Sequence, residues 1–193
     1  MLVFERKETV MDEIKKHTIA VLVDNEAGVL SQVSRLFSRK GFNIESLAVG
    51  TTDNPLVSRI TIEVMADEDH CLLIANQLRK LFPVHSLKLL PPEKSIRREL
   101  LLLKVKAQNS EKRNEIIQIA NIFRANILDV SVGALTLAMI GDESKTEAFE
   151  KILDEFEILE LARTGIVALE RGQETINDDT KEKGEFNYGK NVL

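Results

Sequence analysis

A glycine-bearing loop is the part of this sequence whose residue types and spacing could do chemistry. Asp24 and Asn25 end an apolar run over 19–23, and Gly28 stands just before a helical pattern. Asp and Asn favour turns, while glycine lets a ligand approach the backbone closely. The first N–H groups of a helix lack partners within the helix and lie at the positive end of its dipole, so they can bind a carboxylate. An ordinary capped turn would have the same sequence, and both interpretations stay open.

Residue patterns typical of catalysis or metal binding are missing from the sequence. The three histidines, His17, His70 and His85, are scattered, and none has a second ligand at a metal-binding spacing. Cys71 is the single cysteine, so it forms no internal disulfide, and it falls in an apolar helical stripe. We interpret a group of carboxylates as complementing the dipole at a helix start: Glu63, Asp67, Glu68 and Asp69. The sequence therefore predicts no catalytic residues and no metal ligands.

Composition limits the class of protein further. The chain has 193 residues, 44% of them hydrophobic, and a formal net charge of −5. A mildly acidic chain without clustered Lys and Arg is a poor candidate for nucleic acid binding. No apolar run approaches the roughly 20 residues of a membrane span, and charges interrupt the apolar start of the chain where a signal peptide would need continuity. We expect no membrane association and a cytoplasmic location.

Residues 17–90 are expected to position the glycine loop through a β-α-β-β-α-β order. Strands are predicted over 17–23, 43–49, 57–64 and 84–90, and helices over 29–40 and 69–82. In the first helix, apolar residues recur at spacings of three and four, and Gly41 follows as a left-handed cap. The same order describes an RNA-binding sheet, but the strands over 57–64 and 100–105 contain no aromatic residue on which bases could stack.

The element order repeats after a polar, proline-containing linker over 91–98. The second unit, 99–172, is expected to have strands over 100–105, 127–132, 135–140, 158–162 and 166–169, with a first helix over 115–124. Ser144 and Glu147 are interpreted as a capping box for its second helix. No glycine loop precedes the first of these helices, so ligand binding is expected in the first unit alone. Residues 1–16 are an N-terminal extension, and 173–193 are expected to form a loose tail.

Both units resemble one known family, the small regulatory subunit of acetolactate synthase, also called acetohydroxyacid synthase. In the first unit the similar segments are 17–23, 25–31, 36–47 and 58–62. In the second unit they are 98–105, 123–125, 129–130, 163–165 and 171–172. The resemblance implies an α+β protein, in which a ferredoxin-like ACT domain over 17–90 precedes a small α/β domain.

The resemblance also implies a function without catalysis by this chain. Members of this family activate a large catalytic subunit that carries thiamine diphosphate, Mg²⁺ and FAD, and make it sensitive to feedback by a branched-chain amino acid, usually valine. The small subunit itself would bind no cofactor. Its effector would lie between two ACT domains of a homodimer. One chain would provide the loop wall, formed by Asn25, Ala27, Gly28, Val29 and Leu30. The neighbouring chain would provide Asn43 and Ile44.

Two other function classes remain as alternatives. A stand-alone tandem ACT protein would sense an amino acid and act on a different partner, whereas an enzyme would need the catalytic residues that the sequence lacks. Retention of a thiamine-dependent large subunit during purification distinguishes the family function from the stand-alone sensor.

Overall fold

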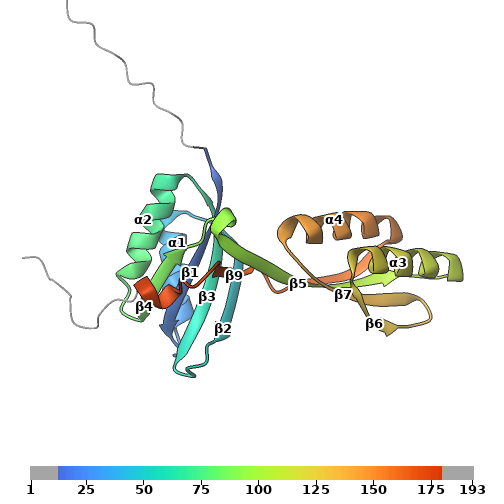
Figure 1. Ribbon diagram of the computed structural model, residues 1–193, viewed down its shortest axis with the longest axis horizontal. Coiled ribbons are helices and arrows are strands. Elements are labelled where there is room, and N and C mark those ends of the chain that lie inside the picture. The colour runs from blue at the N-terminus through green and yellow to red at the C-terminus, as the bar shows by residue number, and fades with distance from the viewer. Residues whose placement is uncertain (1–12, 180–193) are drawn as a thin grey trace, which may run out of the picture.

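A computed structural model describes residues 13–179 as two α/β units joined by a long strand (Figure 1). The first unit has the order β1 (Lys15–Asp24), α1 (Val29–Lys40), β2 (Ile44–Thr51), β3 (Val57–Ala66), α2 (Glu68–Arg79) and β4 (Val84–Leu89). Its antiparallel sheet has the strand order β2-β3-β1-β4. The expected ferredoxin-like βαββαβ arrangement is confirmed.

The second unit repeats this arrangement. After the short helix η1 (Pro92–Lys94), it contains β5 (Ser95–Lys106), α3 (Ser110–Phe123), β6 (Asn126–Val130), β7 (Ala134–Gly141), α4 (Glu143–Leu153), η2 (Asp154–Phe156) and β8 (Ile158–Arg163). The sheet order β6-β7-β5-β8 matches that of the first unit, strand for strand. Alternate residues of β5 are buried against α3 and α4, including Leu101, Leu103 and Val105.

Helix α1 shows how the sequence determines a local element. Its buried residues Val29, Val33, Leu36 and Phe37 recur at spacings of three and four, so one face packs on the sheet. Gly41 ends the helix in the left-handed conformation, at φ 74°. The observed range agrees with the predicted range of 29–40, because the apolar pattern and the glycines at both ends point to the same boundaries.

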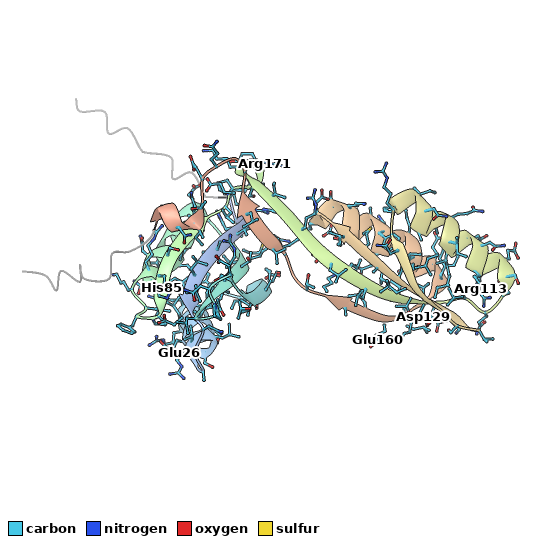
Figure 2. All side chains as sticks on the ribbon, turned by 60° about the horizontal axis from the view of Figure 1, so that its bottom comes forward. Glu26, His85, Arg113, Asp129, Glu160 and Arg171 are labelled. Atoms are coloured by element: carbon cyan, nitrogen blue, oxygen red, sulfur yellow. The ribbon has the colours of Figure 1, made fainter. Side chains whose placement is uncertain are left out.

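The C-terminal segment returns to the first unit. Strand β9 (Val167–Glu170) pairs with the first residues of β5, from Ser95↔Glu170 to Arg98↔Val167, and η3 (Ile176–Asp179) follows it. A third apolar cluster joins this segment to the face of the first sheet that α1 and α2 do not cover: Ala20, Leu22, Leu90, Ile166, Ala168 and Ile176. Figure 2 accordingly shows Arg171 beside the first unit, although it follows the second unit in sequence.

Four local expectations differ from the structure. Residues 95–98 of the expected linker form the start of β5, and Ile176 of the expected loose tail is 9% exposed and packed. Helix α2 ends at Arg79 instead of residue 82. The predicted capping box is wrong: Asp142 is the N-cap of α4 and accepts a hydrogen bond from the Lys145 N–H, while Ser144 donates to Asp142. Residues 1–12 and 180–193 lie outside the described residues.

Candidate functional site

The loop before α1 is held in place by the side chain of Asn25. Its Nδ2 donates a hydrogen bond to the Pro55 carbonyl (2.8 Å), and its Oδ1 accepts one from Ser58 Oγ (3.0 Å). The Asn25 backbone N–H also donates to the Leu56 carbonyl (2.8 Å). These three hydrogen bonds fix the loop to the turn between β2 and β3 and to the start of β3. Asn25 therefore holds the loop in place, and its side-chain carbonyl oxygen is also a hydrogen-bond acceptor.

Gly28 leaves the start of α1 open. It is the N-cap residue, at φ 88° and ψ −13°, and no side chain caps the helix there. A Cβ added at Gly28 would meet no heavy atom within 4 Å, and the first helical turn contains no acidic residue. The Val29 N–H donates to the Glu26 carbonyl (3.4 Å), so the N–H groups that follow it and the positive end of the dipole are the part of the helix start without an internal carboxylate.

The apolar residues that follow have different accessibility. Val29 is 5% exposed and packs in the first core, so its side chain is not available to a ligand. Leu30 is 42% exposed, and Ala27 is also exposed. An apolar contact beside the helix start can therefore come from Leu30.

Asn43 and Ile44 lie at the other end of α1. Asn43 is exposed and donates from Nδ2 to Glu45 Oε1 (2.8 Å), while Ile44 is partly buried at the start of β2. Helix α1 has 12 residues, which corresponds to about 18 Å of helix. Within one chain, the structure does not bring Asn43 and Ile44 together with the loop around Gly28.

The histidines and the cysteine have separate structural surroundings. His17 Nε2 contacts the Ala66 carbonyl (3.1 Å), His70 Nδ1 contacts Asp67 (2.6 Å), and His85 Nε2 contacts Asp24 (2.7 Å). Cys71 is 1% exposed, and burial raises the pKa of its thiol to about 11. Over residues 13–179, no group of three or more His, Cys, Asp or Glu side chains is arranged to hold a metal ion, and no helix is long and apolar enough to cross a membrane.

Glu63 was assigned wrongly to the carboxylates of a helix start. Asp67 does cap α2, by accepting from the His70 N–H (2.8 Å), but Glu63 lies on β3 and is 3% exposed. Burial raises the pKa of the Glu63 carboxyl, with Arg97 at 3.8 Å opposing this effect.

A polar cavity of about 340 Å³ between the two units was not predicted from the sequence. Its lining includes Lys16, Glu63, Glu99 and Arg163. Glu99 is 4% exposed and pairs with Arg163 (3.3 Å), and Lys16 pairs with Glu143 across the units. The available signal was a glutamate next to apolar residues in one predicted strand and another directly before a second predicted strand, because a buried carboxylate requires partners.

Two family models match the chain over most of the described residues. Residues 19–86 match the AHAS small subunit-like ACT domain, and residues 98–172 match the small subunit of acetolactate synthase. The fold and the open helix start therefore define the class: a two-unit protein whose first unit is an ACT domain.

Several named relatives are similar to this chain in sequence across both units. A probable acetolactate synthase small subunit from Archaeoglobus fulgidus is 48% identical over 157 residues, which cover 81% of this chain and 98% of the relative. The acetolactate synthase small subunit of Mycobacterium bovis is 46% identical over 82% of this chain and 94% of its own. The crystal structure of the acetolactate synthase small subunit from Thermotoga maritima is 39% identical and superposes with a TM-score of 0.78, covering 83% of this chain and all of that one. The chain belongs to the family of acetolactate synthase small subunits.

Proposed function

We propose that this chain activates the catalytic subunit of acetolactate synthase and makes that enzyme sensitive to feedback by a branched-chain amino acid, with valine as the effector. The observation that carries the proposal is the uncapped start of α1 at Gly28, next to a sheet whose edge strand is β2. The names of the relatives support a catalytic subunit as the partner. Thiamine diphosphate, Mg²⁺ and FAD belong to that partner, and the complex works in the cytoplasm.

The effector site is completed by a second copy of the chain. Thr51 pairs with Ser58, which in turn binds Asn25, so the end of β2 lies on the same side of the unit as the glycine loop. If two β2 edges pair in antiparallel fashion, the start of one strand faces the end of the other. Ile44 and Asn43 of a second copy then approach the loop that they cannot reach within their own chain.

The two parts of this site suit a short amino acid. The effector carboxylate accepts hydrogen bonds from the free N–H groups beyond Gly28, and its ammonium donates to an Asn carbonyl oxygen. Asn25 Oδ1 retains a second acceptor position beside its bond from Ser58. Leu30 from one chain and Ile44 from the other provide apolar surface for a branched side chain.

Reconstitution with the catalytic subunit tests this function. The full chain alone, given pyruvate and thiamine diphosphate, should form no acetolactate, whereas adding it to the catalytic subunit should raise turnover and make it sensitive to valine. Asn43→Ala should lower the affinity for valine by about tenfold, as expected for the loss of one hydrogen bond to a charged group. Turnover by the chain alone, or an unchanged rate of the catalytic subunit, would refute the regulatory function.

A further inference from the structure

The segment 164–166, here called the crossover, connects β8 in the second unit to β9 on the first and contacts β2 directly. The Ile166 N–H donates a hydrogen bond to Ser46 Oγ (3.1 Å). Gly165 has φ +76°, and a Cβ at this position would lie 2.6 Å from Ser46 Oγ and 3.5 Å from the backbone of Leu47. A side chain at 165 would therefore require Ser46 Oγ to rotate away or the crossover to move, and either change would break the contact.

Ser46 lies two residues beyond Ile44, at an irregularity of the strand. The register between β2 and β3 shifts there, because Ile44 pairs with Val64 whereas Ser46 pairs with Glu63. Such a bulge bends a strand and re-aims its side chains. A displacement of Ile44 at the strand start therefore changes the position of Ser46 under the crossover.

At its other end, the crossover is fixed to the second unit. The Thr164 N–H donates to the Leu100 carbonyl (3.1 Å), and Thr164 Oγ1 accepts from the Leu100 N–H (3.1 Å). Arg163, the preceding residue, pairs with Glu99 on β5 and with Glu150 on α4. These contacts anchor the crossover to both β5 and α4 of the second unit.

A second polar contact joins the units at the same cavity, which β2 and the crossover also line. Lys16 on β1 pairs with Glu143 in the first turn of α4. Both side chains are about one-third exposed, and neither contacts β2 through the polar interactions described above. This ion pair supports the junction, but it does not connect the start of β2 to the second unit.

We propose that the Ser46–crossover contact transmits the effector signal from β2 to the second unit. This inference rests on the proposed effector site at Ile44, and it makes Ser46 and Gly165 positioning residues, not effector contacts. Occupation of the site fixes the start of β2, the bulge carries this change to Ser46, and the crossover passes it to β5 and α4. Allosteric coupling requires such a physically connected element whose two states the effector distinguishes.

Ser46→Ala in the full chain tests the link, because it removes the acceptor of the Ile166 N–H and retains the Cβ. Valine affinity is measured by calorimetry on the full chain, and activation and inhibition are measured on the reconstituted holoenzyme. We expect valine affinity within about threefold of wild type and normal activation, with maximal inhibition reduced by about half or more, since coupling of about 5- to 150-fold is typical of allosteric proteins. Gly165→Ala, which breaks the same contact, should have the same effect.

Lys16→Gln is the matched control, because it breaks the Lys16–Glu143 pair and leaves both partners of the Ser46–Ile166 hydrogen bond unchanged. It should retain inhibition within about twofold of wild type, since an ion pair exposed by about one-third contributes about 1 kcal/mol or less. Thermal unfolding of each variant verifies that it is folded.

The possible outcomes separate this inference from the function on which it rests. If valine fails to inhibit the wild-type holoenzyme, the proposed feedback function fails. If wild type is inhibited and folded Ser46→Ala and Gly165→Ala are inhibited equally well, the proposed link is overturned. The link is also overturned if Lys16→Gln loses as much inhibition as Ser46→Ala, because the junction as a whole would then carry the signal.

Discussion

Replacement of Gly28 by Asp should abolish feedback while leaving activation intact. The added Cβ meets no heavy atom within 4 Å, so the cost to folding comes from the left-handed backbone at φ 88°, about 1 to 2 kcal/mol for a residue with a side chain. Asp is also favourable near a helix start, which offsets part of this strain. The variant should therefore fold and bind the catalytic subunit.

The loss of effector binding follows from the same geometry. The new carboxylate can accept hydrogen bonds from the N–H groups that would otherwise bind the effector carboxylate, and a hydrogen bond to a charged group contributes about 1.5 to 3 kcal/mol. Repulsion between two carboxylates about 4 Å apart adds about 1 kcal/mol at the solvent-exposed surface. The total of about 3 kcal/mol corresponds to roughly a hundredfold weaker binding of valine.

Gly28→Asn is the matched control, because it has the same shape and tolerates the left-handed conformation but carries no charge. It should lose about tenfold in valine affinity through competition for the N–H groups alone. Valine titration of holoenzyme reconstituted with each variant measures both effects. Wild-type feedback in Gly28→Asp would show that the loop is only a capped turn and would refute the effector site.

Three further predictions concern folding and reactivity. Ile176→Ala should destabilise the chain by about 2 kcal/mol or more, because Ile176 is 9% exposed in the third apolar cluster. A chain ending after Gly172 lacks Ile176 and should show a similarly lowered Tm in calorimetry, whereas a chain ending after Asp179 retains Ile176 and should not. Cys71 should react with a thiol reagent at pH 8 only after unfolding, since it is 1% exposed and burial raises its pKa to about 11. Glu63→Gln should increase resistance to urea at pH 7, because the raised pKa of Glu63 makes its ionised form unfavourable in the folded state. This advantage should shrink as the pH falls from the raised pKa toward the ordinary value of 4.5, and it should be lost below 4.5, where the wild-type carboxyl is protonated in both states.

Local sequence signals predicted the helices and strands well, but they did not predict the contacts between segments that are far apart in the sequence. Helix α1 was predictable because its apolar spacing and the glycines at 28 and 41 agree. The cap of α4 was missed because Asp142 and Ser144 both match the preferred cap residues at the same spacing of three from their partners. The structure selects Asp142, because β7 ends at Gly141 and the helix begins at Glu143. The return of β9 to β5 was not predictable, because Ser95 and Glu170 are far apart in sequence and neither segment has a strong periodic pattern.

The candidate site was predictable only as far as one chain can specify it. The open helix start follows from Gly28, because few other residues adopt φ 88° there. The separation of Asn43 from Gly28 follows from the predicted helix over 29–40, whereas burial of the Val29 side chain required the structure. Glu99 and Arg163 were missed as a junction pair because their contact joins strands 64 residues apart.

The return of the C-terminal segment has a consequence for synthesis of the chain on the ribosome. The sheet face containing Ala20 and Leu22 is covered by Ile166, Ala168 and Ile176, which are translated after the strands and helices of both sheets up to β8. The last strand of the first sheet, β4, ends at Leu89, about 87 residues before Ile176, so Ile176 emerges roughly 4 to 17 s later at about 5 to 20 residues per second. The second unit can close its own sheet with β8 before β9 is available. The unit that is synthesised first is therefore the last to have its apolar sheet face covered. Until then, this face is accessible to chaperones or to neighbouring nascent chains.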